Sequence, residues 1–576
     1  MAGIFRKIAP WPMGMAIALS AAFALPEIVA SQTASEVTPD SFQPPQQRLS
    51  GAVVFTGQAG TQAPPGSENL SIQIADVTIK DPLPQLDTAN AAYRERLTRG
   101  RIAVSEIFEA TADLEAAYAQ AGFVLTRVVL PEQSLSDGGV LRVVVVNGFV
   151  EAVDDSRVSD QVRRRVGGLT QNLLDKPGLT LAELERALLL AGDTPGVALG
   201  SALAAGQRPG GTIIALDPQF RPVTGFVGFD NLVSDDLGEP ILNGGLELNS
   251  LFNLGESIYF RATGSPSGFL SGDPRYRTLA AGVAFPIGLS GLTFNLEFTN
   301  SRTQPDTIAA PTTSTFDRQS LRLFYPWIRS RNVNLSSQFS IDFQQDEQDL
   351  AMATGDSALY RDELVALRFG TNLSLQQESG AFFQGGVILS QGLDGLGARS
   401  AADAASGPPL SRQGADADFS KLVLAASYQR PLGENLSLAL SGRVQSSFGD
   451  ALVTSEQFSI TGAQELSSLD SGAVRGDNGW VLRGELSTQR RIDVAGLSLV
   501  ASPYLFAAFG SVKRERPTIV ETSRTDAGAY GIGVDLFLST DSRFRSSSVR
   551  VEFGRGERDD SVPDDNRLTI FGTYRF

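Results

Sequence analysis

The C-terminal two-thirds of the chain consists largely of short stretches in which apolar and polar residues alternate. About sixteen such stretches follow residue 218, separated by clusters of Gly, Asp, Asn, Ser and Pro. They lie near 219–231, 239–252, 256–264, 275–287, 290–301, 314–326, 332–344, 361–376, 380–392, 418–431, 435–447, 479–489, 496–514, 527–539, 547–556 and 566–576. Alternation with a period of two residues is typical of β-strands with one polar and one apolar face. A spacing of roughly 22 residues per strand and connection suits tilted membrane-spanning strands of ~9–11 residues.

An even number of such strands can close into a barrel, and crossing a membrane requires closure. An open edge in lipid would leave backbone N–H and C=O groups unpaired, at several kcal/mol each. In the last stretch, one face carries Leu568, Ile570, Gly572, Tyr574 and Phe576, and the other carries Thr569, Thr573 and Arg575. We expect the first face to contact lipid, because the opposite choice would place Arg575 in the bilayer at up to ~2–4 kcal/mol. Residues 219–576 are therefore predicted to form a mainly β, 16-stranded antiparallel transmembrane barrel with a long loop at 448–478.

Between residues 70 and 218 the alternation gives way to helical periodicity. Helices are predicted over 87–98, 104–121 and 159–174 and from Thr180 onward, with strands near 72–77, 123–130, 140–146, 150–153 and 211–216. Thr180 and Glu183 have the spacing of a capping box, in which each side chain satisfies a free backbone N–H at the helix start. The order of elements occurs twice, which predicts two small α/β domains at 70–149 and 150–218.

The N-terminus has the pattern of an export signal. Basic residues precede an apolar stretch at 13–25, and Pro26 and small residues follow it. This stretch is shorter than the ~20 residues that a membrane-spanning helix needs. We assign residues 1–30 to a signal peptide. Residues 31–69 are rich in Ser, Thr, Gln, Pro and Gly, which cannot bury an apolar core, and are predicted to be a linker.

Composition removes several classes of function. The chain has no His and no Cys, which excludes His-dependent triads, His/Cys zinc sites and redox dithiols. Its formal net charge of −16 argues against a nucleic-acid binder, which normally has a basic surface. We therefore expect no catalytic site, cofactor or metal, and no role as an enzyme.

The residues between 70 and 218 also resemble a known kind of domain. Gly122, Phe123, Leu130, Pro131 and Gly139 stand in a pattern that closely resembles the first POTRA domain of two-partner secretion transporters, the haemolysin activation and secretion proteins. Residues 184–190 and 193–197 resemble the second POTRA domain. The resemblance implies periplasmic modules that receive an unfolded exported protein. A short open sheet suits that role, because an extended peptide can pair with its edge.

The barrel region carries further residues of this family. Residues 228–231 resemble the opening strand, 325–331 resemble the mid-barrel turn Tyr-Pro-x-Ile-Arg-Ser-Arg, and 456–458 resemble the entry to the long sixth extracellular loop. The terminal Tyr574 and Phe576 resemble the last strand of outer-membrane proteins, which the barrel assembly machinery reads. The resemblance therefore extends from about residue 70 to the C-terminus.

One expected feature of the family is altered. In this family the sixth loop folds into the lumen, and the Arg of its Val-Arg-Gly tip pairs with the Asp of a Phe-x-Asp-x-Gly motif on the thirteenth strand. The corresponding motif here runs from Phe506 to Gly510 and has Ala508 at the acidic position. The register of the loop places the tip on residues 466–469, which contain no Arg.

Two hypotheses for the loop follow. The only Val-Arg-Gly is formed by Val474, Arg475 and Gly476, with Asp477 next. In the first hypothesis the usual lock is missing, and the loop is held otherwise, for example by Arg475 with Asp535 or Glu552. In the second, Arg475 is still the tip and its partner has shifted. Relatives often thread a plug helix through the barrel, but residues 31–67 show no amphipathic helix, so we expect no such plug.

The predicted function is an outer-membrane pore that secretes one dedicated exoprotein, with its POTRA domains in the periplasm. The expected partners are this unfolded exoprotein bound by the POTRA domains, the barrel assembly machinery and outer-membrane lipid; we expect a monomer. A barrel assembly factor of the same superfamily, a solute porin and a surface adhesin are the alternatives. Assembly factors usually have more than two POTRA domains, and a porin would not need residues 70–217. The Arg-Gly-Asp tripeptide at 475–477 occurs in some integrin ligands, but chance explains it better.

Overall fold

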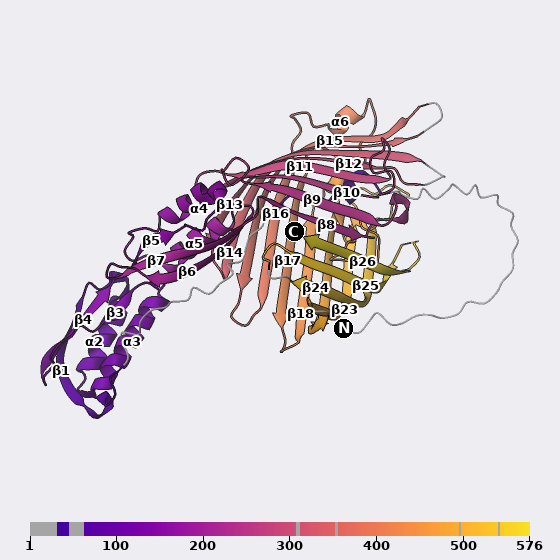
Figure 1. Ribbon diagram of the computed structural model, residues 1–576. Coiled ribbons are helices and arrows are strands. Elements are labelled where there is room, and N and C mark those ends of the chain that lie inside the picture. Colours follow the sequence, from indigo (N-terminus) through magenta and orange to yellow (C-terminus); the bar gives the residue numbers. More distant parts are fainter. Residues whose placement is uncertain are drawn as a thin grey trace, which may run out of the picture. The chain divides into compact units, whose positions relative to one another are not determined.

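The computed structural model describes residues 32–44, 63–306, 311–351, 355–494, 497–539, 542–560 and 562–576. The predicted signal peptide and residues 45–62 of the predicted linker lie outside these ranges. Figure 1 shows that the described chain forms two small α/β modules and then a barrel of long strands. Within the described ranges, no helix combines the length and apolarity needed to cross a bilayer.

The first module is a four-stranded sheet with two helices on one face. Its elements are β1 (Ser71–Lys80), α2 (Asp87–Thr98), β2 (Arg101–Ala103), α3 (Val104–Gln120), β3 (Arg127–Val129) and β4 (Gly139–Val146). The strand order is β2-β1-β4-β3. Leu97, Leu114 and Tyr118 from the helices share one core with Val143 of the sheet. The strand predicted at 123–130 is shorter than expected, because a turn in which the Thr126 N–H bonds to Phe123 O (3.0 Å) takes up its first residues.

The second module has a three-stranded sheet and two helices. Its elements are β5 (Phe149–Asp154), α4 (Asp160–Gln171), α5 (Leu181–Gly192), β6 (Val197–Ala205) and β7 (Gly211–Phe220), with strand order β5-β7-β6. The capping box forms as predicted: Glu183 N–H donates to Thr180 Oγ1 (3.3 Å), and Thr180 N–H donates to Glu183 Oε2 (3.0 Å). Sequence analysis missed β6, which is made mainly of Ala, Gly and Leu and so carries little strand propensity. Pairing with β7 along the whole length of β6 holds it in the strand conformation instead.

The remaining chain closes into an antiparallel barrel of 16 strands, which confirms the predicted fold class. The strands are β8 (Val223–Asp230), β9 (Ile241–Asn249), β10 (Ser257–Gly264), β11 (Tyr276–Pro286), β12 (Thr293–Thr303), β13 (Thr312–Arg329), β14 (Val333–Leu350), β15 (Ser357–Gln376), β16 (Phe382–Gly392), β17 (Ser420–Pro431), β18 (Leu436–Ser446), β21 (Asn478–Thr488) with its continuation β22 (Arg490–Val494), β23 (Leu497–Lys513), β24 (Arg524–Ser539), β25 (Ser546–Arg558) and β26 (Asp565–Arg575). The last strand pairs with the first, and Phe576 exchanges two backbone hydrogen bonds with Gly225 (3.0 and 3.1 Å). No strand edge is left open in the barrel wall.

The alternation predicted from the sequence determines which side chains face inward. On β26, Leu568 and Tyr574 are 50% and 41% exposed, whereas Thr569 between them is buried. On β12 the inward set is polar and buried throughout: Asn295, Glu297, Thr299, Ser301 and Thr303. The outward Phe298 on the same strand is half exposed. The barrel therefore encloses a polar lumen inside an apolar outer band, as a transmembrane β-barrel requires.

Candidate functional site

The lumen is filled by two segments that do not belong to the barrel wall. One is the long loop (residues 447–477) between β18 and β21, which contains a 3-10 turn at Thr454–Glu456 and a short hairpin of β19 (Phe458–Ser459) and β20 (Arg475–Gly476). The other is the N-terminal segment (residues 32–44), which contains the one-turn helix α1 (Ala34–Val37). Both contact inward-facing side chains of the wall. The candidate functional site is this lumen together with its two inserts.

The tip of the long loop lies where its register placed it, on residues 466–469. Ser467 Oγ donates a hydrogen bond to Glu552 of β25 and accepts one from Arg483 Nη1 of β21 (2.8 Å). Arg483 and Glu552 form an ion pair (2.5 Å) in which both side chains are 2% exposed. In this chain both charges therefore stand on the wall, and the loop contributes a hydroxyl between them.

The thirteenth-strand motif explains why no acid is needed at its centre. Phe506 and Ala508 of β23 are buried in an apolar cluster with Leu466 and Leu469 of the loop. Ala508 pairs in register with Arg483 on the neighbouring β21. An Asp at position 508 would compete with Glu552 for Arg483, and the small Ala leaves the loop tip room to pack. Gly510 also leaves room for the loop, since a Cβ there would lie 3.0 Å from Ile460 of the loop.

Arg475 does not pair with either acid that the first hypothesis suggested. Glu552 is taken by Arg483, and Asp535 forms a bidentate pair with Arg550 (2.5 and 2.6 Å). Arg475 instead forms an ion pair with Glu36 of the N-terminal segment, and the Glu36 side chain is 5% exposed. The predicted partners were wrong because the wall acids are neutralised by wall arginines. The partner of Arg475 lies outside the barrel sequence, and Arg475 itself stands in the β19–β20 hairpin and not at the tip that the second hypothesis assumed.

The N-terminal segment is more than the predicted linker, and the expectation that no plug from this region occludes the barrel is wrong for residues 32–44. Tyr276 Oη donates to Val37 O (2.6 Å), Thr303 Oγ1 to Gln32 O (3.3 Å), and Ala34 N–H donates to Ser314 Oγ (3.1 Å). Within residues 32–44 the only helix is the one-turn α1. The lumen, however, is polar, so hydrogen bonds can hold a polar segment there without an apolar core.

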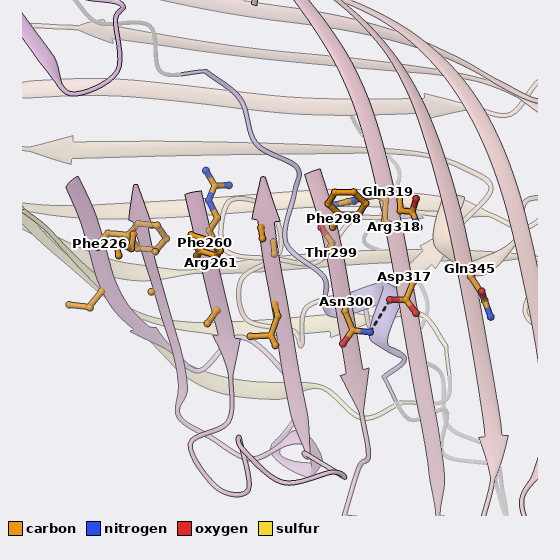
Figure 2. A pocket seen from close by; sticks show the side chains of 18 of the residues that line it. Phe226, Phe260, Arg261, Phe298, Thr299, Asn300, Asp317, Arg318, Gln319 and Gln345 are labelled. Carbon is orange, nitrogen blue, oxygen red and sulfur yellow. Dashed lines mark hydrogen bonds between the residues drawn. The ribbon is translucent and has the colours of Figure 1, made fainter. Parts of the chain in front are cut away.

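Phe42 anchors the other end of this segment. Its ring stacks on Tyr259 of β10 with centroids 4.7 Å apart, and Arg261 lies 5.3 Å from its centroid. Its backbone N–H donates to Glu297 Oε2 (3.2 Å). Figure 2 shows this part of the wall, with Arg261, Thr299 and Arg318 on their strands, the N-terminal segment running past them and the Asn300–Asp317 hydrogen bond dashed. The strands drawn there also line a cavity of about 850 Å³, which includes the outward-facing Phe260, Leu279 and Phe298 and does not include Phe42.

Two further polar clusters hold the base of the long loop. Glu456 is buried between Arg368 of β15 (2.5 Å) and Lys421 of β17 (2.6 Å). Burial raises the pKa of Glu456, but these two cations outweigh that effect and hold its pKa below the ordinary range. The entry to the loop is therefore fixed by a carboxylate that stays charged at neutral pH.

Asp477, at the loop's exit, is fully buried and joins three extracellular connections. Its carboxylate accepts from Leu452 N–H (3.0 Å), Glu515 N–H (2.6 Å) and Arg412 (3.5 Å). Arg412 in turn pairs with Glu521 (3.0 Å). Because the Asp477 side chain has no exposed surface, the Arg-Gly-Asp tripeptide does not present it to a receptor.

At the periplasmic end of the lumen, two sequence motifs from different parts of the chain meet. Arg329 of the mid-barrel turn pairs with Asp193 of the second module (2.6 Å), and Arg331 pairs with Glu185 (3.5 Å). A cavity of about 740 Å³ lies here, lined by the turn, by Asp193 and by Phe42. These two ion pairs thus fix the second module to the mouth of the barrel.

The POTRA pattern residues have structural roles in the first module. Gly122 ends α3 with a φ of +95°, which favours glycine, and Phe123 follows it into the core. Leu130 packs against the same core, and Pro131 O accepts from Gln133 Nε2 (3.3 Å). Gly139 begins β4, and a Cβ there would lie 2.9 Å from Ser136 O. None of these residues reaches the lumen contacts described above.

Among the described residues, no group of three or more His, Cys, Asp or Glu side chains is arranged to hold a metal ion. A closed barrel with a polar, loop-filled lumen and two preceding α/β modules defines the POTRA-plus-barrel class of outer-membrane protein. The model of the haemolysin secretion/activation proteins ShlB/FhaC/HecB matches residues 210–536, and the ShlB-type POTRA domain matches residues 84–148. The first match spans more than half of the chain, and the chain belongs to this family. Its barrel is accordingly located in the outer membrane, with the POTRA domains in the periplasm.

Individual relatives agree with this assignment. The outer membrane transporter CdiB of Dickeya dadantii (strain 3937) is 26% identical over 380 residues, 65% of this chain and 64% of the relative. CdiB of Escherichia coli O6:K15:H31 is 26% identical over 381 residues, 64% of this chain and 61% of the relative. The chain thus matches just under two-thirds of the length of these curated relatives.

Two solved structures share the fold. CdiB from Escherichia coli has a TM-score of 0.68 at 19% identity, covering 95% of this chain and 94% of that one. CdiB from Acinetobacter baumannii has a TM-score of 0.60 at 15% identity, covering 92% and 95%.

Proposed function

We propose that the chain is the outer-membrane transporter of a two-partner secretion system and moves one dedicated exoprotein to the cell surface. The observation that carries the proposal is the nature of the lumen. It is wide enough to hold two polypeptide segments, and among the described residues neither segment joins the wall as a strand; side-chain contacts hold most of both. When these inserts move, the same polar space accommodates an extended cargo chain.

The POTRA domains, at 70–149 and 150–218, receive the unfolded exoprotein in this proposal. An extended segment pairs with a free sheet edge, because edge strands present unpaired N–H and C=O groups. The edges are β2 and β3 in the first sheet and β5 and β6 in the second. The nine-residue β6 is the longest of them. Cargo then enters the lumen and folds outside the cell, and this folding gives the movement its direction.

The remaining assignments are part of the same proposal. Phe576 and Tyr574 form the C-terminal signal that the barrel assembly machinery reads, and the transporter works as a monomer surrounded by outer-membrane lipid. The chain acts without a catalytic site. Val474, Arg475, Gly476 and Asp477 hold the long loop in place and do not bind cargo.

Deletion of the gene tests the function. The surface and medium of the deletion strain should lose one exported protein, encoded beside this gene, and regain it when the gene is restored. General loss of many outer-membrane barrels would instead identify an assembly factor. An unchanged set of exported proteins with reduced solute uptake would identify a porin.

A further inference from the structure

The wall contacts of the N-terminal segment are directed at its backbone. The side chains of Tyr276, Ser301, Thr303, Ser314 and Glu297 bond to peptide groups of residues 32, 34, 37 and 42, at 2.6 to 3.3 Å. Four of these five side chains are hydroxyls, which can donate or accept. A surface that binds peptide N–H and C=O groups does not depend on the sequence of the chain lying on it.

Side chains of the segment add further contacts: Gln32 Oε1 accepts from Ser234 N–H (3.0 Å), and the ring of Phe42 makes an aromatic contact. Phe42 is 5% exposed and occupies a pocket formed by Tyr259, Arg261 and Ala284. The stacked ring and the guanidinium beside it favour an aromatic occupant, because the face of an aromatic ring attracts a cation. The pocket therefore recognises an aromatic side chain within a track that otherwise binds largely the backbone of the segment.

The pocket is held rigid by a second layer of buried groups. Tyr259 Oη donates to Glu297 Oε2 (2.9 Å) and accepts from Asn295 Nδ2 (2.9 Å). Arg322 holds both acceptors, donating to Asn295 Oδ1 (2.8 Å) and to Glu297 Oε1 (3.2 Å). None of these four residues exceeds 2% exposure. Because these side chains are already held in place, a ligand that enters the pocket does not have to order them first.

We propose that the inward face of β10 to β13 is a polypeptide-binding track for cargo, and that residues 32–44 occupy it as a resident substitute. The cargo's extended chain replaces this segment during transport and places an aromatic side chain in the Tyr259–Arg261 pocket. This inference rests on the proposed function and adds to it the surface used by the cargo and the side-chain class that it recognises.

The test uses the full chain in planar lipid bilayers and a synthetic peptide as the probe. Phe42→Ala vacates the pocket in the protein. A peptide with the sequence of residues 32–44, added on the periplasmic side, should then block the ionic current, and the same peptide with Ala in place of its Phe should block about tenfold more weakly. Tyr259→Ala, added to Phe42→Ala, should remove the difference between the two peptides.

The matched control is Phe260→Ala, because Phe260 is the next residue on β10 and is 51% exposed on the outer face. It should leave the difference between the peptides intact. Arg261→Gln is a milder variant for the case in which Tyr259→Ala does not fold, and it should reduce the difference. Equal block by the two peptides in the Phe42→Ala protein, or loss of the difference in Phe260→Ala, would overturn the track. If gene deletion still removes one exported protein while the peptides block equally, this inference fails and the proposed function stands.

Discussion

Arg475 shows how the partner of a single charged residue can lie far away in the sequence. Its charge was recognisable in the sequence as the only Arg within a Val-Arg-Gly, but its partner Glu36 lies 439 positions away in a segment that composition marked as a linker. The wall acids Glu552 and Asp535 are paired with Arg483 and Arg550. A partner of this kind cannot be deduced from spacing, because it depends on which segment fills the lumen.

Reversing the Arg475–Glu36 pair tests this contact. Arg475→Glu or Glu36→Arg alone places two like charges together in a buried site, which should cost about 3–5 kcal/mol and displace the N-terminal segment. Open-channel events in planar bilayers should become more frequent in each single variant. The double variant Glu36→Arg with Arg475→Glu should return them toward wild type, since it restores an ion pair. Arg524→Glu, at an exposed pair with Asp526, is the control and should have no effect.

Asp477 is the second residue whose substitution should affect several loops at once. Asp477→Ala leaves the N–H groups of Leu452 and Glu515 buried without an acceptor, at about 1–3 kcal/mol each. The long loop and the connection at 514–523 should then become accessible to protease added to intact cells. Asp418→Ala, at an exposed acid on a neighbouring extracellular connection, should leave them protected. Equal resistance of Asp477→Ala and wild type would show that the loops are held elsewhere.

At the scale of elements, the sequence predicted the helices and strands whose apolar residues recur with a regular period. Helices α2 and α3 and the barrel strands were placed to within a few residues, because each strand has one polar and one apolar face. The strand β6 was missed since Ala and Gly carry little preference of their own. The N-terminal segment was missed for a different reason: its order comes from a polar wall formed by residues more than 200 positions away.

The α5 capping box gives a prediction at this scale with a pH dependence. Thr180→Ala should weaken protection of α5 amides in hydrogen exchange by about 1 kcal/mol. The hydrogen bond from Lys176, with those from Thr180, lowers the pKa of Glu183 below its usual value. Because the pKa of Glu183 is lower in the folded chain than in the unfolded chain (~4.3), the ionised Glu183 stabilises the fold above the unfolded pKa. This stabilisation disappears as the pH falls through the folded pKa. The difference in exchange between wild type and Glu183→Gln should therefore be present at pH 7 and shrink below about pH 4. A difference that grows on acidification would contradict this assignment.

At the scale of the whole molecule, the structure combines a closed barrel, two segments inside its lumen and a contact between the second POTRA module and the barrel mouth. The sequence predicted the barrel and the POTRA modules, because both are repeats of simple patterns. It predicted the position of the loop tip but not its contacts, since those depend on the three-dimensional neighbours of Ser467. The lumen is therefore the part of the protein for which the structure added most.

The contact between the second module and the barrel belongs to this scale. Arg329→Ala removes the bidentate pair with Asp193 (2.6 and 2.8 Å) that joins the second module to the barrel mouth. We expect secretion to fall severalfold while the amount of folded barrel, measured by heat-modifiable migration in gels, stays the same. Arg430→Ala, at an exposed Arg at the periplasmic end of β17, should change neither measurement. A loss of folded barrel in Arg329→Ala would show that the turn serves folding and not transport.

The most direct measurement locks the N-terminal segment in the lumen. The chain has no Cys, so Ala34→Cys with Ser314→Cys introduces a single possible disulfide between the segment and the wall. With the disulfide formed, export of the exoprotein should stop, and a reductant should restore it, whereas each single-Cys variant should secrete normally under both conditions. Secretion by the oxidised double variant at the wild-type level would contradict the claim that cargo passes through this lumen.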